Sequence, residues 1–230
     1  MATDLTPKKS DEVSGLLGRT VDSVVQGLTG LAASEKKDVA LSVGHIIQRM
    51  RAGKFVQTVK DEWDNLVAKG KIQEEFVESE QNLDCLQDLL DFIDKDVPDA
   101  QRFAAMKNLY LHVAVDADSP RPDYLPQQLM KVCRSLSSGE IIVLLTTYKV
   151  TLSQRSFQEN HVSASGWLKT IADESGLYGE LVQIYEETLI TKGFLPRRIH
   201  SDGSGVVVGK HFRLTELAVA LCQRIAASPV

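Results

Sequence analysis

Residues 167–221 read WLKTIADESGLYGELVQIYEETLITKGFLPRRIHSDGSGVVVGKHFRLTELAVAL, and this stretch decides the fold expected for the C-terminal part of the chain. Apolar residues repeat at helical spacing twice, first over 167–172 and again from Gly179 onward. The glycine of Ser175-Gly176-Leu177 lies between the two and suits the positive φ of a tight turn. Lys192-Gly193 then gives the second helix a basic last turn and a glycine cap. The stretch therefore predicts two short helices joined by a turn.

After these helices, the sequence predicts a β-hairpin and a last helix. Two extended runs, 194–200 and 206–214, flank a cluster of glycine, serine and aspartate at 201–205. Apolar residues at helical spacing resume at Leu217 and continue to Ile225. The expected order is therefore helix, turn, helix, hairpin and helix.

This order, and part of the wording, resembles a known module. The runs LITKGFL (189–195) and FRLTELA (212–218) are similar to the helix end, wing and closing helix of winged helix-turn-helix repressors such as the multiple-antibiotic-resistance-regulator-like group. The resemblance is at fold level and is confined to residues 138–226. It implies a winged-helix domain, whose second helix would enter the major groove of DNA and whose wing would contact phosphates.

The N-terminal part begins with a glycine-rich helical pattern. Its apolar stripe follows heptad spacing and consists of Leu17, Val21, Val24, Leu28 and Leu31. Glycines among these residues allow another helix to approach closely, so we expect a packed helical hairpin. A helix on a membrane surface, over residues 13–34, is the alternative, although this segment lacks the cationic face that such helices usually carry.

The remaining sequence up to residue 137 is also helical in pattern, and it sets the domain boundaries that we expect. Ser119-Pro120-Arg121-Pro122 is the best linker candidate, and Ser137-Ser138-Gly139-Glu140 has the spacing of a capping box. We expect a flexible N-terminus (1–10), a helical bundle (11–118), a linker with a connecting helix (119–137) and a winged-helix-like domain (138–230). The predicted fold class is mainly α: an N-terminal helical bundle followed by a C-terminal winged-helix-like domain with one β-hairpin.

Composition describes an ordinary globular chain. It has 230 residues, 43% hydrophobic and 25% charged, which suits one large or two small domains. The formal net charge of −5 gives no global basic field for nucleic acid. The three cysteines, Cys85, Cys133 and Cys222, form no CxxC pair and are odd in number, so we expect buried free thiols. With no signal-peptide pattern and no long apolar run, the expected location is the cytoplasm.

Charge alternates along the N-terminal half. Residues 36–71 hold eight Lys or Arg against four acidic residues, whereas residues 74–99 hold ten acidic residues and one lysine. These stretches suit either pairing within the chain or association with a copy or a charged partner. Leucines at helical spacing within 74–99 predict an acidic helix, and we expect Val97-Pro98-Asp99 to end it and to begin another helix. The aspartates on one face of this acidic helix diverge, so they do not predict a metal site. No Glu-x-x-His pair, P-loop or Gly-x-Ser-x-Gly elbow is present, and we expect no catalytic residue, metal or cofactor.

Two non-enzymatic functions remain, and both use the C-terminal module. With Val182, Tyr185 and Leu189 buried, the second helix would turn five residues outward for a partner: Glu180, Gln183, Glu186, Glu187 and Thr191. The wing would carry the contacts Arg197, Arg198, His200, Lys210, His211 and Arg213. Carboxylates repel DNA, so the glutamates of this second helix favour an adaptor, assembly factor or regulator that binds a protein or self-associates. A DNA-binding transcriptional regulator, with phosphate contacts from the basic wing, is the alternative. No small-molecule substrate is implied.

Overall fold

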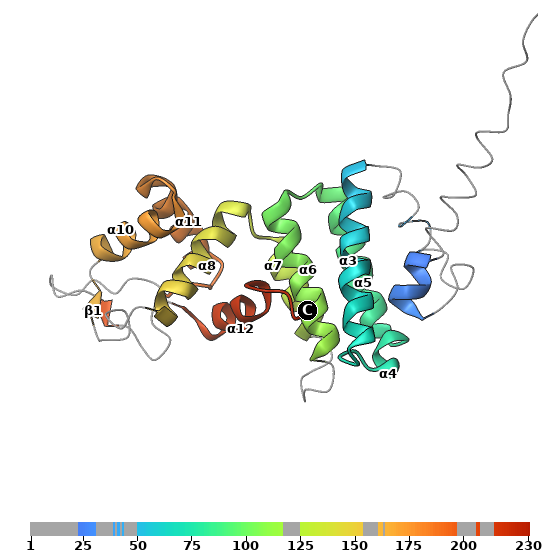
Figure 1. The fold of residues 1–230 in the computed structure, drawn as a ribbon. Helices are drawn as coiled ribbons and strands as arrows, with labels where there is room; N and C mark the ends of the chain where they lie inside the picture. The colour runs from blue at the N-terminus through green and yellow to red at the C-terminus, as the bar shows by residue number, and fades with distance from the viewer. Residues whose placement is uncertain are drawn as a thin grey trace, which may run out of the picture. The chain divides into compact units, whose positions relative to one another are not determined.

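The structure is a computed structural model, and it describes residues 23–30, 39, 41, 43, 50–116, 125–153, 161–162, 164–196, 206–207 and 214–230 (Figure 1). These residues are mainly helical, as the composition and periodicity predict. They belong to two compact units. Unit 1 falls within residues 1–98, 110–131 and 228–230, and unit 2 within 99–109 and 132–227. This division differs from the boundary expected at residue 118, because residues 99–109 group with the C-terminal part of the chain.

Unit 1 is a set of helices around aromatic residues. It contains a helix at 23–29, α3 (Met50–Ala68), α4 (Glu74–Val77), α5 (Glu80–Asp91), η1 (Phe92–Asp96), the second part of α6 (Ala100–Val115) and the first part of α7 (Leu125–Arg134). Trp63 of α3 stacks on Tyr110 of α6, with ring centroids 5.4 Å apart and planes 15° apart. Both rings are fully buried. Such stacking adds to the stabilisation that burial of the rings already gives.

A buried amide joins three segments of unit 1. Asn82 of α5 is fully buried, and its Nδ2 donates to the carbonyl oxygens of Leu28, at 2.9 Å, and Val77, at 2.8 Å. Its Oδ1 accepts a hydrogen bond of 2.9 Å from the hydroxyl of Tyr110. The helix at 23–29 is thereby fixed against α5. Its residues Val24 and Leu28 are buried by the unit, so they pack inside the protein.

The acidic helix ends where the sequence predicts. Ser79 caps α5 by accepting a hydrogen bond of 3.1 Å from the backbone N–H of Asn82. At the other end, α5 continues into the π-helical turn η1, and Val97 has a left-handed φ of 45° before Pro98. A β-branched residue rarely adopts this conformation, and proline cannot continue the helix. The predicted break at Val97-Pro98-Asp99 is therefore confirmed.

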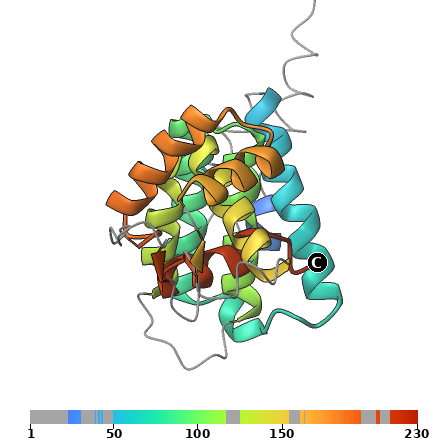
Figure 2. The ribbon, with the colours of Figure 1, turned by 90° about the vertical axis from the view of Figure 1, so that its left-hand side faces the viewer.

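Unit 2 is built on α8 (Ser138–Ser153). The helices α10 (Ala164–Ser175), α11 (Gly179–Thr191) and α12 (Glu216–Ile225) all contact α8 (Figures 1 and 2). The buried core of the unit includes Ile141, Val143 and Leu144 of α8, Trp167 and Ile171 of α10, Val182 and Leu189 of α11, and Leu221 of α12. In the same unit, the Arg102 guanidinium donates to the carbonyl oxygens of Arg134 and Leu136, at 3.0 Å each, and so satisfies acceptors at the C-terminal end of α7.

The predicted β-hairpin is wrong. Among the described residues, extended pairing is limited to β1 (His161–Val162) and β2 (Val206–Val207), which are antiparallel with His161 opposite Val207. The partner of β2 therefore precedes α10, whereas the hairpin prediction placed it after α11. The extended run expected from Phe194 instead begins as a helix cap, because the Phe194 backbone N–H bonds to the carbonyl oxygen of Leu189 at 2.9 Å. No helix in the described part of the chain is long and apolar enough to cross a membrane.

Candidate interaction surface

The helix α11 is apolar on two sides, and only one of them is covered. Val182 and Leu189 are fully buried in unit 2. On the outer side, the exposed fractions are 79% for Tyr178, 37% for Leu181 and 56% for Ile184. Tyr178 is the N-cap of α11, and the three residues are spaced three apart, which places them along one side of the helix. We call these three residues the apolar strip.

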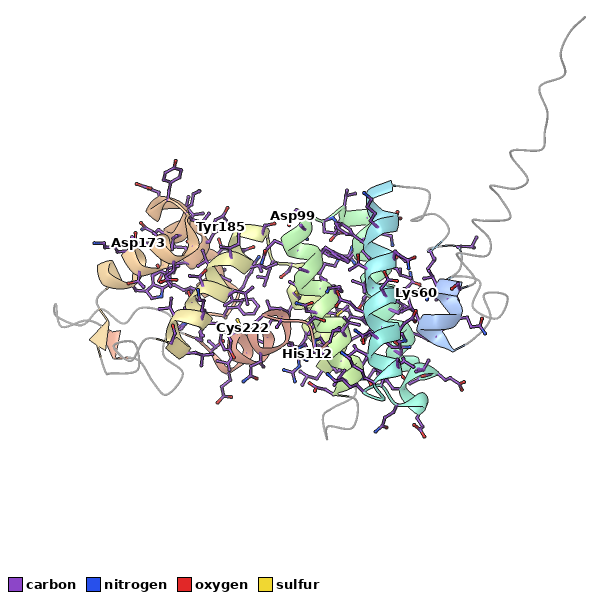
Figure 3. All side chains as sticks on the ribbon, viewed as in Figure 1. Lys60, Asp99, His112, Asp173, Tyr185 and Cys222 are labelled. Atoms are coloured by element: carbon purple, nitrogen blue, oxygen red, sulfur yellow. The ribbon has the colours of Figure 1, made fainter. Side chains whose placement is uncertain are left out.

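Carboxylates border the apolar strip. Glu180 and Glu187 are exposed and lie four residues before and three residues after Ile184, so both are its neighbours on the helix surface. No lysine or arginine occurs between Gly179 and Thr191. On α10, Asp173, which Figure 3 labels, is also exposed. The next residue, Glu174, is exposed as well. Lys149 lies 3.6 Å from Glu174, and this exposed ion pair is weak. The outer side of α11 therefore combines apolar and acidic groups.

A glycine in α8 lets α11 approach closely. A Cβ atom built on Gly139 would lie 2.1 Å from Cζ of Tyr185, well inside the closest distance that real Cβ atoms show. The ring of Tyr185, from α11, therefore rests on the first turn of α8 (Figure 3). This contact places the buried side of α11 against α8 and leaves the apolar strip outward.

The last turn of α11 is tied to the first turn of α8 by a buried carboxylate. Glu140 is 3% exposed, and its Oε1 accepts a hydrogen bond of 2.7 Å from Nζ of Lys192. Its Oε2 accepts one of 2.6 Å from the backbone N–H of Ser137, whose hydroxyl accepts one of 3.3 Å in return from the backbone N–H of Glu140. The predicted capping box is thus confirmed. Burial alone would raise the pKa of Glu140, but the hydrogen bonds from Lys192 and Ser137 lower it below the ordinary value of 4.5.

The direction of this pKa shift predicts a pH-dependent contribution to stability. A carboxyl whose pKa is lower in the folded state stabilises the fold above its unfolded pKa and loses that contribution as the pH falls through its folded pKa. We expect Lys192→Met to lower the free energy of unfolding by about 2 kcal/mol at pH 7, since it removes a charged hydrogen bond from a buried acceptor. The deficit should shrink as the pH falls below 4.5, in urea titrations at several pH values. The exposed Lys169, changed to Met, is the control, and a deficit that stays constant with pH would contradict the assignment.

The C-terminal end of α11 is also closed by its backbone. Gly193 has a φ of +80°, and the N–H groups of Gly193 and Phe194 bond to the carbonyl oxygens of Ile190 and Leu189. These are the two hydrogen bonds of a Schellman motif, so the predicted glycine cap is confirmed. Thr215, the N-cap of α12, donates from Oγ1 to the carbonyl oxygen of Gly193 at 2.8 Å. The C-terminal end of the helix that carries the apolar strip is therefore fixed, by its own backbone and by contacts with Glu140 and Thr215.

Four of the five residues that the sequence places outward on this helix are exposed: Glu180, Gln183, Glu187 and Thr191. The fifth, Glu186, is only 2% exposed and cannot contact a partner as expected. It lies four residues after Val182 and three before Leu189, which puts it on the buried side of the helix. The predicted wing contacts, namely Arg197, Arg198, His200, Lys210, His211 and Arg213, lie outside the described residues.

The apolar strip was missed at the sequence level, although a signal for it exists. Val182, Tyr185 and Leu189 already account for a complete buried side of the helix. Two further apolar residues, Leu181 and Ile184, do not lie on that side. A helix of a small domain that is apolar on two sides either lies in the centre of its domain or offers one side to a partner. The positions of Leu181 and Ile184 on the helix, away from its buried side, would have indicated the second possibility.

The cysteines and the groups that could bind a metal are the other candidates for a functional site. The three cysteines are free and buried, as expected. Burial raises the pKa of the Cys85 thiol to about 12, with further effects from Asp88 and Asp84, and burial raises that of Cys133 to about 12. Such thiols are poor nucleophiles at neutral pH. Within the described part of the chain, no group of three or more His, Cys, Asp or Glu residues is placed to hold a metal ion.

Comparisons of the chain with protein-family models, with curated proteins and with solved structures find no match. The residues of α11 and their surroundings are therefore the basis on which we infer the function.

Proposed function

We propose that this chain is a non-enzymatic interaction protein, an adaptor or regulator, that binds a protein partner through the outer side of α11. The observation that supports the proposal most is the apolar strip, because Tyr178 and Ile184 are more than half exposed on a helix whose C-terminal end is fixed by contacts with Glu140 and Thr215. Aromatic and aliphatic residues on rigid elements are the usual anchors of protein interfaces. A strip of three residues suits a small, reversible interface.

The same surface is unsuited to DNA. Binding to DNA gains free energy when Lys and Arg displace counterions from phosphates, and α11 presents Glu180 and Glu187 instead. Base edges are read mainly by side chains that form hydrogen bonds, whereas Ile184 and Leu181 have neither a donor nor an acceptor in their side chains. A protein partner covers apolar side chains and leaves carboxylates at the rim of the interface. The charge and the polarity of α11 therefore both favour protein over DNA.

The proposal is tested by site-specific cross-linking in the native cell. A benzophenone amino acid replaces Ile184 or Leu181 in the full chain, and it replaces Asn65, exposed on α3, as the control. We expect positions 184 and 181 to trap the same discrete protein and position 65 to trap none. The trapped protein, once purified, should bind the chain at least about tenfold more weakly after Ile184→Glu, since a charge replaces an apolar anchor.

Two results would overturn the proposal. One is the absence of a cross-linked protein from both positions of α11, or an equal product from position 65. The other is sub-micromolar binding of a random DNA duplex that weakens steeply with salt and is unchanged by Ile184→Glu, measured by fluorescence anisotropy. That second result would favour the DNA-binding regulator.

A further inference from the structure

We infer that the segment that binds α11 is a basic amphipathic helix, which sets a small apolar face on the strip and places Lys or Arg beside Glu180 and Glu187. This inference rests on the proposed function and names the chemistry of its partner. Charge is the first argument. Residues 164–191, which hold α10, the turn and α11, contain one lysine and five acidic residues. Four of these acids, Asp173, Glu174, Glu180 and Glu187, are exposed, whereas Glu186 is buried.

Charge also excludes other occupants of the strip. Two copies of the chain joined by this face would place two strips bordered by Glu180 and Glu187 against each other, because a two-fold interface uses the same surface patch of both copies. Like charges at an interface cost free energy. Phosphates of nucleic acid and of anionic lipid are repelled by the same carboxylates. A cationic segment is the occupant that Glu180 and Glu187 attract, whereas they repel the other two.

The geometry of the strip suits a helix. Tyr178 and Ile184 are six residues apart, which is roughly 9 Å along a helix axis. This length matches two or three apolar side chains spaced i, i+3 and i+4 on a partner helix, the usual way in which an amphipathic helix is bound. Glu180 lies beside the middle of the strip and Glu187 lies one turn beyond its C-terminal end, and both are within reach of Lys or Arg one turn away from those anchors. The exposed ring of Tyr178 offers an Arg side chain a further favourable contact.

The test uses three synthetic peptides with the full chain. The first is a helical peptide of about 16 residues with Leu at i, i+3, i+4 and i+7 and Arg beside them. The second replaces every Arg with Glu, and the third scrambles the first. In fluorescence anisotropy we expect saturable binding of the cationic helix alone. Ile184→Ser should weaken it about tenfold, and Glu180→Lys with Glu187→Lys should reverse the preference toward the acidic peptide.

Matched controls separate a specific site from simple charge attraction. Asp61→Lys with Glu75→Lys, both exposed in unit 1, changes the net charge by the same amount and should leave binding unchanged. Circular dichroism of each variant checks that the fold is retained.

Several outcomes would overturn the inference: equal binding of the scrambled peptide, no effect of Ile184→Ser, or no binding of the cationic helix. A dimer seen by sedimentation velocity and lost on Ile184→Ser would show that a second copy is the occupant. The proposed function fails separately, when no protein is trapped at positions 184 and 181. A protein trapped there without binding of the cationic helix would leave the function standing and remove only this partner class.

Discussion

Gly139→Ala is expected to lower the free energy of unfolding by about 3 kcal/mol, although alanine normally stabilises a helix by about 1 kcal/mol relative to glycine. The reason is the ring of Tyr185. An added Cβ would lie 2.1 Å from its Cζ, 2.3 Å from its Cε2 and 2.5 Å from its hydroxyl oxygen. Two ring atoms and the hydroxyl oxygen block the position, and Tyr185 is partly buried against α8, so the ring must move together with α11. Overpacking of this kind forces side chains away from their preferred rotamers and shifts the backbone.

A double-mutant cycle tests this explanation by denaturant unfolding. Tyr185→Ala removes the obstacle, so adding Gly139→Ala to it should cost nothing or gain a few tenths of a kcal/mol. Gly179→Ala in α11 is the matched control, because a Cβ there meets nothing within 4 Å. Equal stability of Gly139→Ala and the parent chain would show that α8 and α11 are not held together by this contact. The single variant should also bind the cationic peptide more weakly, since α11 is displaced.

The sequence predicted those parts of the fold that depend on neighbours along the chain. The capping box at Ser137–Glu140, the cap at Gly193 and the break at Val97 each depend on a few consecutive residues, and all three are confirmed. The hairpin failed because the apolar pair Phe194-Leu195 after Gly193 suits a strand and a helix cap equally well. Phe194 and Leu195 are buried, their backbone N–H groups donate to the carbonyl oxygen of Leu189 in α11, and the Phe194 carbonyl oxygen accepts from the N–H of Thr215. Periodicity cannot show such contacts.

The interaction surface was only partly predictable, for a related reason. The exposed carboxylates Glu180 and Glu187 follow from helical spacing once one buried side is assigned. Spacing does not show how far a neighbouring helix extends, and that extent decides whether Glu186 is covered and whether Ile184 is exposed. The close approach of α11 to α8 at Gly139 determines how much of α11 is covered. The sequence does not show which aromatic ring will rest on that glycine.

Asn82→Ala is expected to have the largest effect in unit 1, lowering the free energy of unfolding by about 4 kcal/mol. The substitution removes three side-chain hydrogen bonds and leaves the Tyr110 hydroxyl and the carbonyl oxygens of Leu28 and Val77 without this donor or acceptor inside the unit. A buried polar group that loses its partner costs about 1–3 kcal/mol, whereas a hydrogen bond that is merely exchanged with water costs much less. Removing the amide also leaves a small cavity beside Tyr110.

Tyr110→Phe separates the three bonds, because it removes one of them and keeps the ring that stacks on Trp63. We expect this variant to lose only about 1–2 kcal/mol, measured by urea unfolding beside Asn82→Ala. Hydrogen exchange locates the difference. Asn82→Ala removes the bond to Leu28, so amide protection at residues 24–29 should fall further than protection in α3, while Tyr110→Phe should leave the ratio between the two unchanged. If Asn82→Ala lowers protection equally at residues 24–29 and in α3, the Asn82 side chain stabilises unit 1 as a whole and does not hold the helix at 23–29 in particular.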